Sequence, residues 1–164
     1  MIVRLGNTLA KKTWETGLFT RPAHTNPLAD WSAHLFAVRH VHYILISNTT
    51  TLYSMVLFGR GITDGGQLID RMTWVIREVM DHDGLGQAYE EYVVPETGRV
   101  TFAKALNRSV TGSMNDLVFQ AKVCLDEEIS PYDVSFLLNE LPMSSLKHRK
   151  PLEAVRLLVT ELLP

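Results

Sequence analysis

The sequence predicts an α+β protein, in which an antiparallel sheet of about four to five strands is covered by about four to five helices and the C-terminal half is helical. Three observations predict this fold class. Runs rich in aromatic and β-branched residues fill positions 31–58, apolar residues recur at helical spacing from position 67 onward, and one short alternating run near position 100 returns to a strand pattern. The 164 residues, 46% hydrophobic and 21% charged, suit a single domain over residues 1–164.

The first thirty residues predict a strand, a short helix and a loop. "IVRL" (2–5) is a short apolar run typical of a strand, and "GNTLAKKTWETG" (6–17) predicts a brief helix that ends near Gly17. "TRPAHTNPLAD" (20–30) carries two prolines, which disfavour regular structure. We therefore expect a surface loop before the next strand.

Residues 31–59 predict a three-stranded antiparallel meander. "WSAHLFAV" (31–38) and "VHYILIS" (41–47) are separated only by "RH", which is the spacing of a β-hairpin. "TLYSMVLFG" (51–59) follows the turn-like "SNTT" and predicts a third strand. Both faces of these strands carry apolar residues, so we expect helices to cover at least part of the sheet.

The remaining chain predicts helices with one late strand. "QLIDRMTWVIREVMDHDG" (67–84) has the strongest helical spacing, and "LGQAYEEYVV" (85–94) predicts a second short helix closed by Pro95. "RVTFAKAL" (99–106) alternates like a strand and is expected to pair back into the sheet. Three further helices are expected, over Met114 to Leu125, "SPYDVSFLLNEL" (130–141) and "PLEAVRLLVTELL" (151–163).

The segment "NRSVTGSMNDLVFQAK" (107–122) is the first candidate for function. Ser113 and Asp116 have the spacing of a capping box, which predicts a helix start there. Asn107, Arg108, Ser109 and Asn115 are hydrogen-bonding residues beyond those that a cap requires. They form either a buried structural network or an exposed binding site. A Gly/Ser-rich helix N-terminus at 112–115 could also hold an anion, with Lys104 and Arg108 supplying charge.

Several longer strings resemble an uncharacterised bacterial family that is classed as a domain of unknown function. They are "DWSAHLF", "ILISNTTTLYS", "FAKALNRSVTGSMNDLVFQAK" and "LNELPMSSLKHRKPLEAV", and the Gly-Ser-Met-Asn-Asp box is the most specific part. Ser47 stands where this family usually has threonine, and Ala105 and Leu106 replace more polar residues. The resemblance covers nearly the whole chain. It implies one recognisable fold that includes the 107–116 box and Asn139, Glu140, Pro142 and Met143, but no activity.

Other residues carry weaker signals. His40 and His42 share a face of the predicted hairpin, but no third metal ligand accompanies them, so neither a metal nor a cofactor is predicted. His34 and Cys124 are expected in the core, and Trp14, Trp31 and Trp74 are expected to be core or interface anchors. "NELPMSSLKHRKP" (139–151) is expected to be a loop between helices.

Charge and hydropathy restrict the partners. The net charge of −2 gives no overall attraction to phosphate backbones, which argues against a nucleic-acid partner. The apolar run around residues 52–58 is far shorter than the ~20 residues that a membrane helix needs. The single cysteine suits a reducing compartment. We expect a cytoplasmic protein, with its oligomeric state left open.

Two functional hypotheses follow. The first is a non-enzymatic module that binds an unknown protein partner or a small anionic ligand through the 107–116 segment. The second is an enzyme acting on a phosphorylated or nucleotide substrate, with the helix N-terminus at 112–115 as the anion site and Asp116 or Glu140 as general base. The candidate ligand-binding residues are Lys104, Asn107, Arg108, Ser109, Gly112, Ser113, Asn115, Asp116, Asn139 and Glu140.

Overall fold

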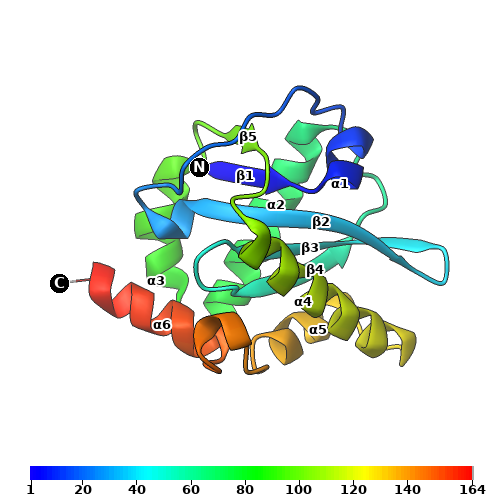
Figure 1. Cartoon of the computed structure of the whole chain (residues 1–164). Helices are drawn as coiled ribbons and strands as arrows, with labels where there is room; N and C mark the ends of the chain where they lie inside the picture. The colour runs from blue at the N-terminus through cyan, green and yellow to red at the C-terminus, as the bar shows by residue number, and fades with distance from the viewer. Residues whose placement is uncertain (164) are drawn as a thin grey trace.

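The chain folds around a five-stranded sheet (Figure 1). The structure is a computed structural model, and it describes residues 1–163. The strands lie in the order β4-β3-β2-β1-β5. β1 pairs in parallel with both β2 and β5, and β2, β3 and β4 form the expected antiparallel meander. The predicted α+β class is confirmed. The strands are β1 (Ile2–Leu5), β2 (Asp30–Val38), β3 (Val41–Asn48), β4 (Ser54–Phe58) and β5 (Thr101–Ala103).

Helices cover both faces of this sheet because both faces are apolar. Along β3, Ile44 and Ile46 belong to one hydrophobic cluster and Leu45 belongs to another. This alternation follows from strand geometry, in which successive side chains point to opposite faces. The first cluster packs beneath α1 (Asn7–Lys12), α2 (Gly65–His82) and α6 (Pro151–Leu162), and the second packs beneath α4 (Arg108–Asp126) and α5 (Pro131–Leu138).

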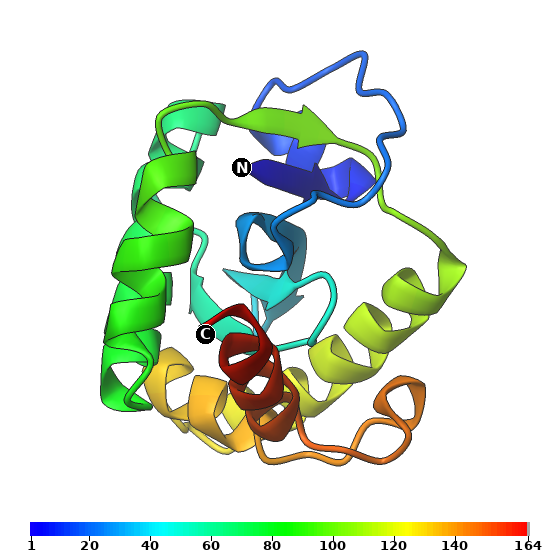
Figure 2. The ribbon, with the colours of Figure 1, turned by 90° about the vertical axis from the view of Figure 1, so that its left-hand side faces the viewer.

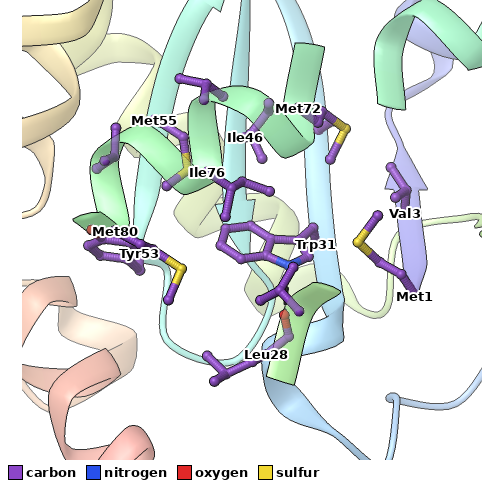
Figure 3. Packing of buried hydrophobic residues seen from close by; sticks show 14 of the residues in the cluster. Met1, Val3, Leu28, Trp31, Ile46, Tyr53, Met55, Met72, Ile76 and Met80 are labelled. Carbon is purple, nitrogen blue, oxygen red and sulfur yellow. Dashed lines mark hydrogen bonds between the residues drawn. The ribbon is translucent and has the colours of Figure 1, made fainter. Parts of the chain in front are cut away.

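Trp31 lies at the centre of the larger cluster (Figure 3). Its ring packs beside Ile46 of β3 and Ile76 of α2, and its indole N–H donates to the Leu28 carbonyl at 2.8 Å. The core position expected for Trp31 is confirmed. Trp14 and Trp74, however, are 82% and 60% exposed. Both side chains lie on the surface, outside the hydrophobic core.

The hairpin between β2 and β3 has the predicted two-residue loop. Arg39 and His40 have positive φ angles of 48° and 67°. Two consecutive left-handed residues let a two-residue loop match the right-handed twist of its strands. This conformation costs energy in residues that carry a Cβ atom, so the loop is held by the long strand pairing on either side.

The helices mostly follow the predicted segments, with two differences. The second short helix runs on through α3 (Gly86–Ala88), a π-helical turn (Tyr89–Val93) and a 3-10 turn (Val94–Glu96), so Pro95 lies inside it. α4 begins at Arg108 rather than near Ser113. Asn107 is its N-cap, because its side-chain oxygen accepts a hydrogen bond from the Val110 N–H at 2.9 Å.

The edge strand β4 is sealed by side chains of α5. Asn139, just after α5, accepts a hydrogen bond from the Ser54 N–H at 2.7 Å and donates to the Ser54 carbonyl at 2.8 Å. Ser135 accepts from the Val56 N–H at 2.9 Å. These side chains take the place of a neighbouring strand, so the exposed edge that usually invites aggregation is blocked along this half of β4.

Candidate functional site

The parallel pairing of β1 brings two strand ends together at one rim of the sheet. The carboxyl ends of β1 and β5 lie side by side, because both strands run in the same direction (Figures 1 and 2). Crevices at the carboxyl ends of parallel strands are common ligand sites. Here such a crevice exists, with a volume of about 560 Å³, and we call it the rim pocket. Its lining residues are Leu5, Gly6, Asn7, Thr8, Leu9, Thr20, His34, Leu35, Lys104, Ala105, Thr111 and Asn115.

One wall of the rim pocket is the turn from β1 into α1 beside His34 of β2. A Cβ atom added to Gly6 would lie 3.1 Å from His34 Cδ2, so glycine lets the chain pass close to the imidazole. His34 is half-buried, and this burial lowers the pKa of its imidazole. The ring is therefore neutral near pH 7 and offers one donor and one acceptor. The sequence-based prediction of a core histidine is correct only in part, since the ring borders the pocket.

Lys104 also lines the rim pocket, and hydrogen bonds hold its backbone. Its N–H donates to the Phe19 carbonyl at 3.0 Å, and its carbonyl accepts from Arg4 Nη1 at 3.4 Å. Its side chain is exposed. Lys104, with Leu5 and Asn7, also borders an adjoining hollow of about 320 Å³ that includes Lys11 and Glu15. The ammonium group of Lys104 can thus contact a ligand in either the rim pocket or the adjoining hollow.

A buried ion pair between β1 and β2 reaches the Lys104 backbone of the rim pocket. Arg4 donates from Nε and Nη2 to the two carboxylate oxygens of Asp30, both at 2.8 Å. It also donates to the carbonyls of Arg21 and Pro22 at 2.9 and 3.0 Å. Burial alone would raise the pKa of Asp30, but hydrogen bonds from the Arg4 side chain and the His24 backbone outweigh it and lower the pKa. Arg4 therefore ties the 20–30 loop and the end of β5 to the sheet.

Three predicted site residues meet at or beside this pocket. Lys104 and Asn115 line it, together with Thr111, which the list of candidates missed. Arg108 lies on the same helical face as Thr111 and Asn115, by the spacing i, i+3 and i+7, and is exposed. The first two turns of α4 thus give one polar face to the rim pocket.

The rest of the 107–116 segment serves other purposes. Asn107 caps α4, and Ser113 is buried with its hydroxyl 2.7 Å from that of Ser145. Asp116 lines a separate hollow of about 230 Å³, with Phe119 and Pro142. The predicted capping box of Ser113 and Asp116 is therefore wrong, because α4 already starts at Arg108. For the same reason residues 112–115 are not a helix N-terminus, and the anion site predicted there does not exist in that form.

Ser109 and Gly112 are exposed on α4 and neither lines the rim pocket. Asn139 is buried and seals β4, as described above. Glu140 accepts a hydrogen bond from Lys150 Nζ at 2.8 Å on the surface, and this contact raises the pKa of the lysine. The 139–140 pair thus has structural contacts away from the rim pocket, and the general base assigned to Glu140 has no support from them.

The polar pocket residues that sequence reasoning missed are Asn7, Thr8, Thr20, His34 and Thr111. They come from four separate parts of the chain, which no single local motif spans. The best available signal was an Asn-Thr pair one residue after a strand, a position where side chains reach the rim of a sheet.

No cluster of three or more histidine, cysteine or acidic side chains within residues 1–163 could hold a metal ion. In the same part of the chain, no helix has the length and apolar character needed to cross a bilayer.

The fold and the pocket define a class of protein: an α+β domain with a mixed sheet and a polar crevice at the carboxyl ends of its parallel strands. The family model described as Domain of unknown function (DUF6933) matches residues 2–154, and the chain belongs to this family. The family resemblance noted in the sequence is thereby confirmed. Comparisons with curated proteins and with solved structures return no significant match.

Proposed function

We propose that the protein is a binding module that holds a small anionic ligand in the rim pocket. The observation that supports this proposal is the convergence of Lys104, Asn7, Thr8, Thr111 and Asn115 on one crevice of about 560 Å³. That volume lies in the range of small-molecule sites, which extends from about 300 to 1,000 Å³. The lining combines these polar groups with apolar side chains such as Leu5, Leu9 and Leu35, a mixture that small-molecule sites also use.

The chemistry of the lining indicates the kind of ligand. Lys104 is the cation of the pocket, and among the described lining residues there is no carboxylate to compete with an anionic ligand. Asn7, Asn115 and the three threonines offer both donors and acceptors. A ligand with one anionic group and several hydroxyl or amide groups would use all of them. Leu5, Leu9 and Leu35 would contact its apolar part.

Binding is favoured over catalysis by what faces the pocket. General acid-base chemistry needs a titrating group within hydrogen-bond reach of the substrate. Asp116 borders a different hollow and Glu140 pairs with Lys150, so neither carboxylate of the enzymatic hypothesis faces the rim pocket. His34 is the one imidazole in the described lining, and it has no carboxylate partner there to orient it.

A thermal-shift screen tests the proposal. The probes are inorganic phosphate, succinate, a sugar phosphate and a nucleoside monophosphate, each added to wild type, Lys104→Ala, Asn115→Ala and the control Lys122→Ala. Lys122 is also an exposed lysine, but it lies further along α4 and outside the pocket. We expect at least one probe to raise the thermal midpoint of wild type and of Lys122→Ala. The Kd of that probe for Lys104→Ala should be about ten-fold or more higher than for wild type, which is the effect of losing one charge-assisted hydrogen bond.

Amide chemical shifts then locate the probe. Shifts confined to residues 5–9, 34–35, 104–105 and 111–115 would support the rim pocket. Equal stabilisation of all four proteins, or shifts elsewhere, would refute it.

A further inference from the structure

A second hollow lies at the opposite edge of the sheet, beside the end of β4. It has a volume of about 300 Å³ and a lining that is almost entirely apolar. It lies between α2 and the start of α5, and we call it the β4-edge hollow. Its lining residues are Val56, Leu57, Phe58, Arg71, Trp74, Val75, Ser130, Pro131 and Tyr132.

Three large aromatic side chains are exposed around this hollow. Trp74, Phe58 and Tyr132 are 60%, 49% and 39% exposed. Single exposed apolar residues are ordinary, but three aromatics around one apolar hollow form a contiguous patch of the kind that marks interaction sites. Tryptophan, tyrosine and arginine are also the residues that most often dominate binding energy in interfaces. Arg71 supplies the arginine, held by a hydrogen bond from its Nη2 to the Phe58 carbonyl at 3.3 Å.

A basic hollow adjoins it. Phe58 also borders a space of about 810 Å³ that is lined by Lys12, His40, His42, Arg60, Val41 and Gly61. Together the two hollows present Lys12, Arg60 and Arg71 as permanent cations, and no acidic residue is among their described lining residues. Asp133, next to Tyr132, accepts a hydrogen bond from Ser130 at 2.9 Å as part of the α5 cap. The pair of hollows is thus positive in a chain whose net charge is −2.

We propose that these two hollows together form a docking surface for an acidic peptide segment of another protein, with a large apolar side chain anchored in the β4-edge hollow and carboxylates facing Lys12, Arg60 and Arg71. Charge complementarity selects this occupant. A second copy of the chain across a two-fold axis would place the same basic groups against each other, which is unfavourable. Single-stranded nucleic acid would need a cationic groove along its backbone, whereas the aromatic hollow itself contains one cation.

A peptide-display selection tests the docking surface. The full chain is the bait, and binders to the double variant Trp74→Ala/Tyr132→Ala are removed. Both side chains are exposed, so these substitutions do not open the core. We expect the recovered peptides to combine several aspartates or glutamates with a large apolar residue. Their Kd, measured by fluorescence anisotropy, should rise about 30-fold for Trp74→Ala, the effect of losing one hot-spot residue.

Matched variants distinguish specific binding at this surface from non-specific binding to exposed aromatic residues. Lys12→Glu/Arg60→Glu should raise the Kd of the peptides at least ten-fold. The control Phe119→Ala, which removes a 64% exposed aromatic side chain on α4, should leave the Kd within two-fold of wild type. Peptides without acidic enrichment, or equal binding to Trp74→Ala, would overturn the proposal. So would self-association in sedimentation that Trp74→Ala abolishes, which would make the occupant a second copy. Binding of an oligothymidine that depends on the same residues would make it a nucleic acid.

Discussion

Replacing Arg4 with methionine is expected to lower the free energy of unfolding by about 3 to 5 kcal/mol, the usual effect of breaking a buried ion pair by removing one partner. Both side chains are essentially inaccessible, with Arg4 and Asp30 each 1% exposed. The variant leaves the Asp30 carboxylate with the His24 N–H at 3.0 Å and Thr49. It also removes the donors to the carbonyls of Arg21, Pro22 and Lys104.

The assay is urea unfolding followed by circular dichroism, with Arg39→Met as the control. Arg39 also pairs with an aspartate at 2.8 Å, but the side chains of Arg39 and Asp126 are 65% and 57% exposed. Exposed pairs contribute about 1 kcal/mol or less, so the control should stay near wild type. A loss of stability in Arg4→Met as small as that of the control would refute the reasoning.

The pH dependence of the same variant follows from linkage. The pKa of Asp30 is lowered in the folded protein, so its contribution to stability is present above the unfolded pKa of about 3.9 and is lost as the pH falls below it. Without Arg4 the folded pKa rises. The difference in stability between wild type and Arg4→Met should therefore widen from about pH 3 to about pH 7. A constant difference across that window would show that the lost charge interaction is not the cause.

Three further outcomes are expected. Asn139→Ala should lower the free energy of unfolding in urea by about 2 to 5 kcal/mol, because it leaves a buried N–H and a buried C=O of Ser54 unpaired. The control Glu140→Ala should lower it by less than about 1 kcal/mol, and equal effects of the two variants would contradict the sealing of β4 by Asn139. His40→Gly should raise the thermal midpoint, since it relieves about 1 kcal/mol of left-handed strain at φ 67°, and an unchanged or lower midpoint would contradict this. His34 has a lowered pKa because of burial, so wild type should lose stability as the pH falls from about 7 to about 5, and His34→Gln should lose less; parallel curves would place the titrating group elsewhere.

The elements with strong local patterns were predictable from the sequence. The meander needed only runs of aromatic and β-branched residues separated by short turns, and α2 needed only its helical spacing. The start of α4 was predicted wrongly because two cap signals compete there. Ser113 has a partner at the capping-box spacing, but burial of Ser113 against Ser145 and packing of Val110 on the second cluster favour the longer helix capped by Asn107.

The candidate site was less predictable because it depends on long-range pairing. β1 pairs in parallel with β2 and also with β5, which returns to the sheet nearly a hundred residues later. Asn7, Thr8 and His34 carry no motif of their own. Their proximity to Lys104 and Asn115 results from the strand order, which the local patterns did not contain.

The hydrogen bonds of the first residues join them to partners about a hundred residues later in the chain, on either side of β5. The N-terminal amine donates to the Arg99 carbonyl at 2.8 Å, and Arg4 reaches the carbonyl of Lys104. One side of β1 can be paired only after β5 has been synthesised. Such distant closures are the slow steps of folding. A nascent chain that ends before α4 lacks Thr111 and Asn115, so a ligand that uses these side chains can bind only after α4 has been synthesised.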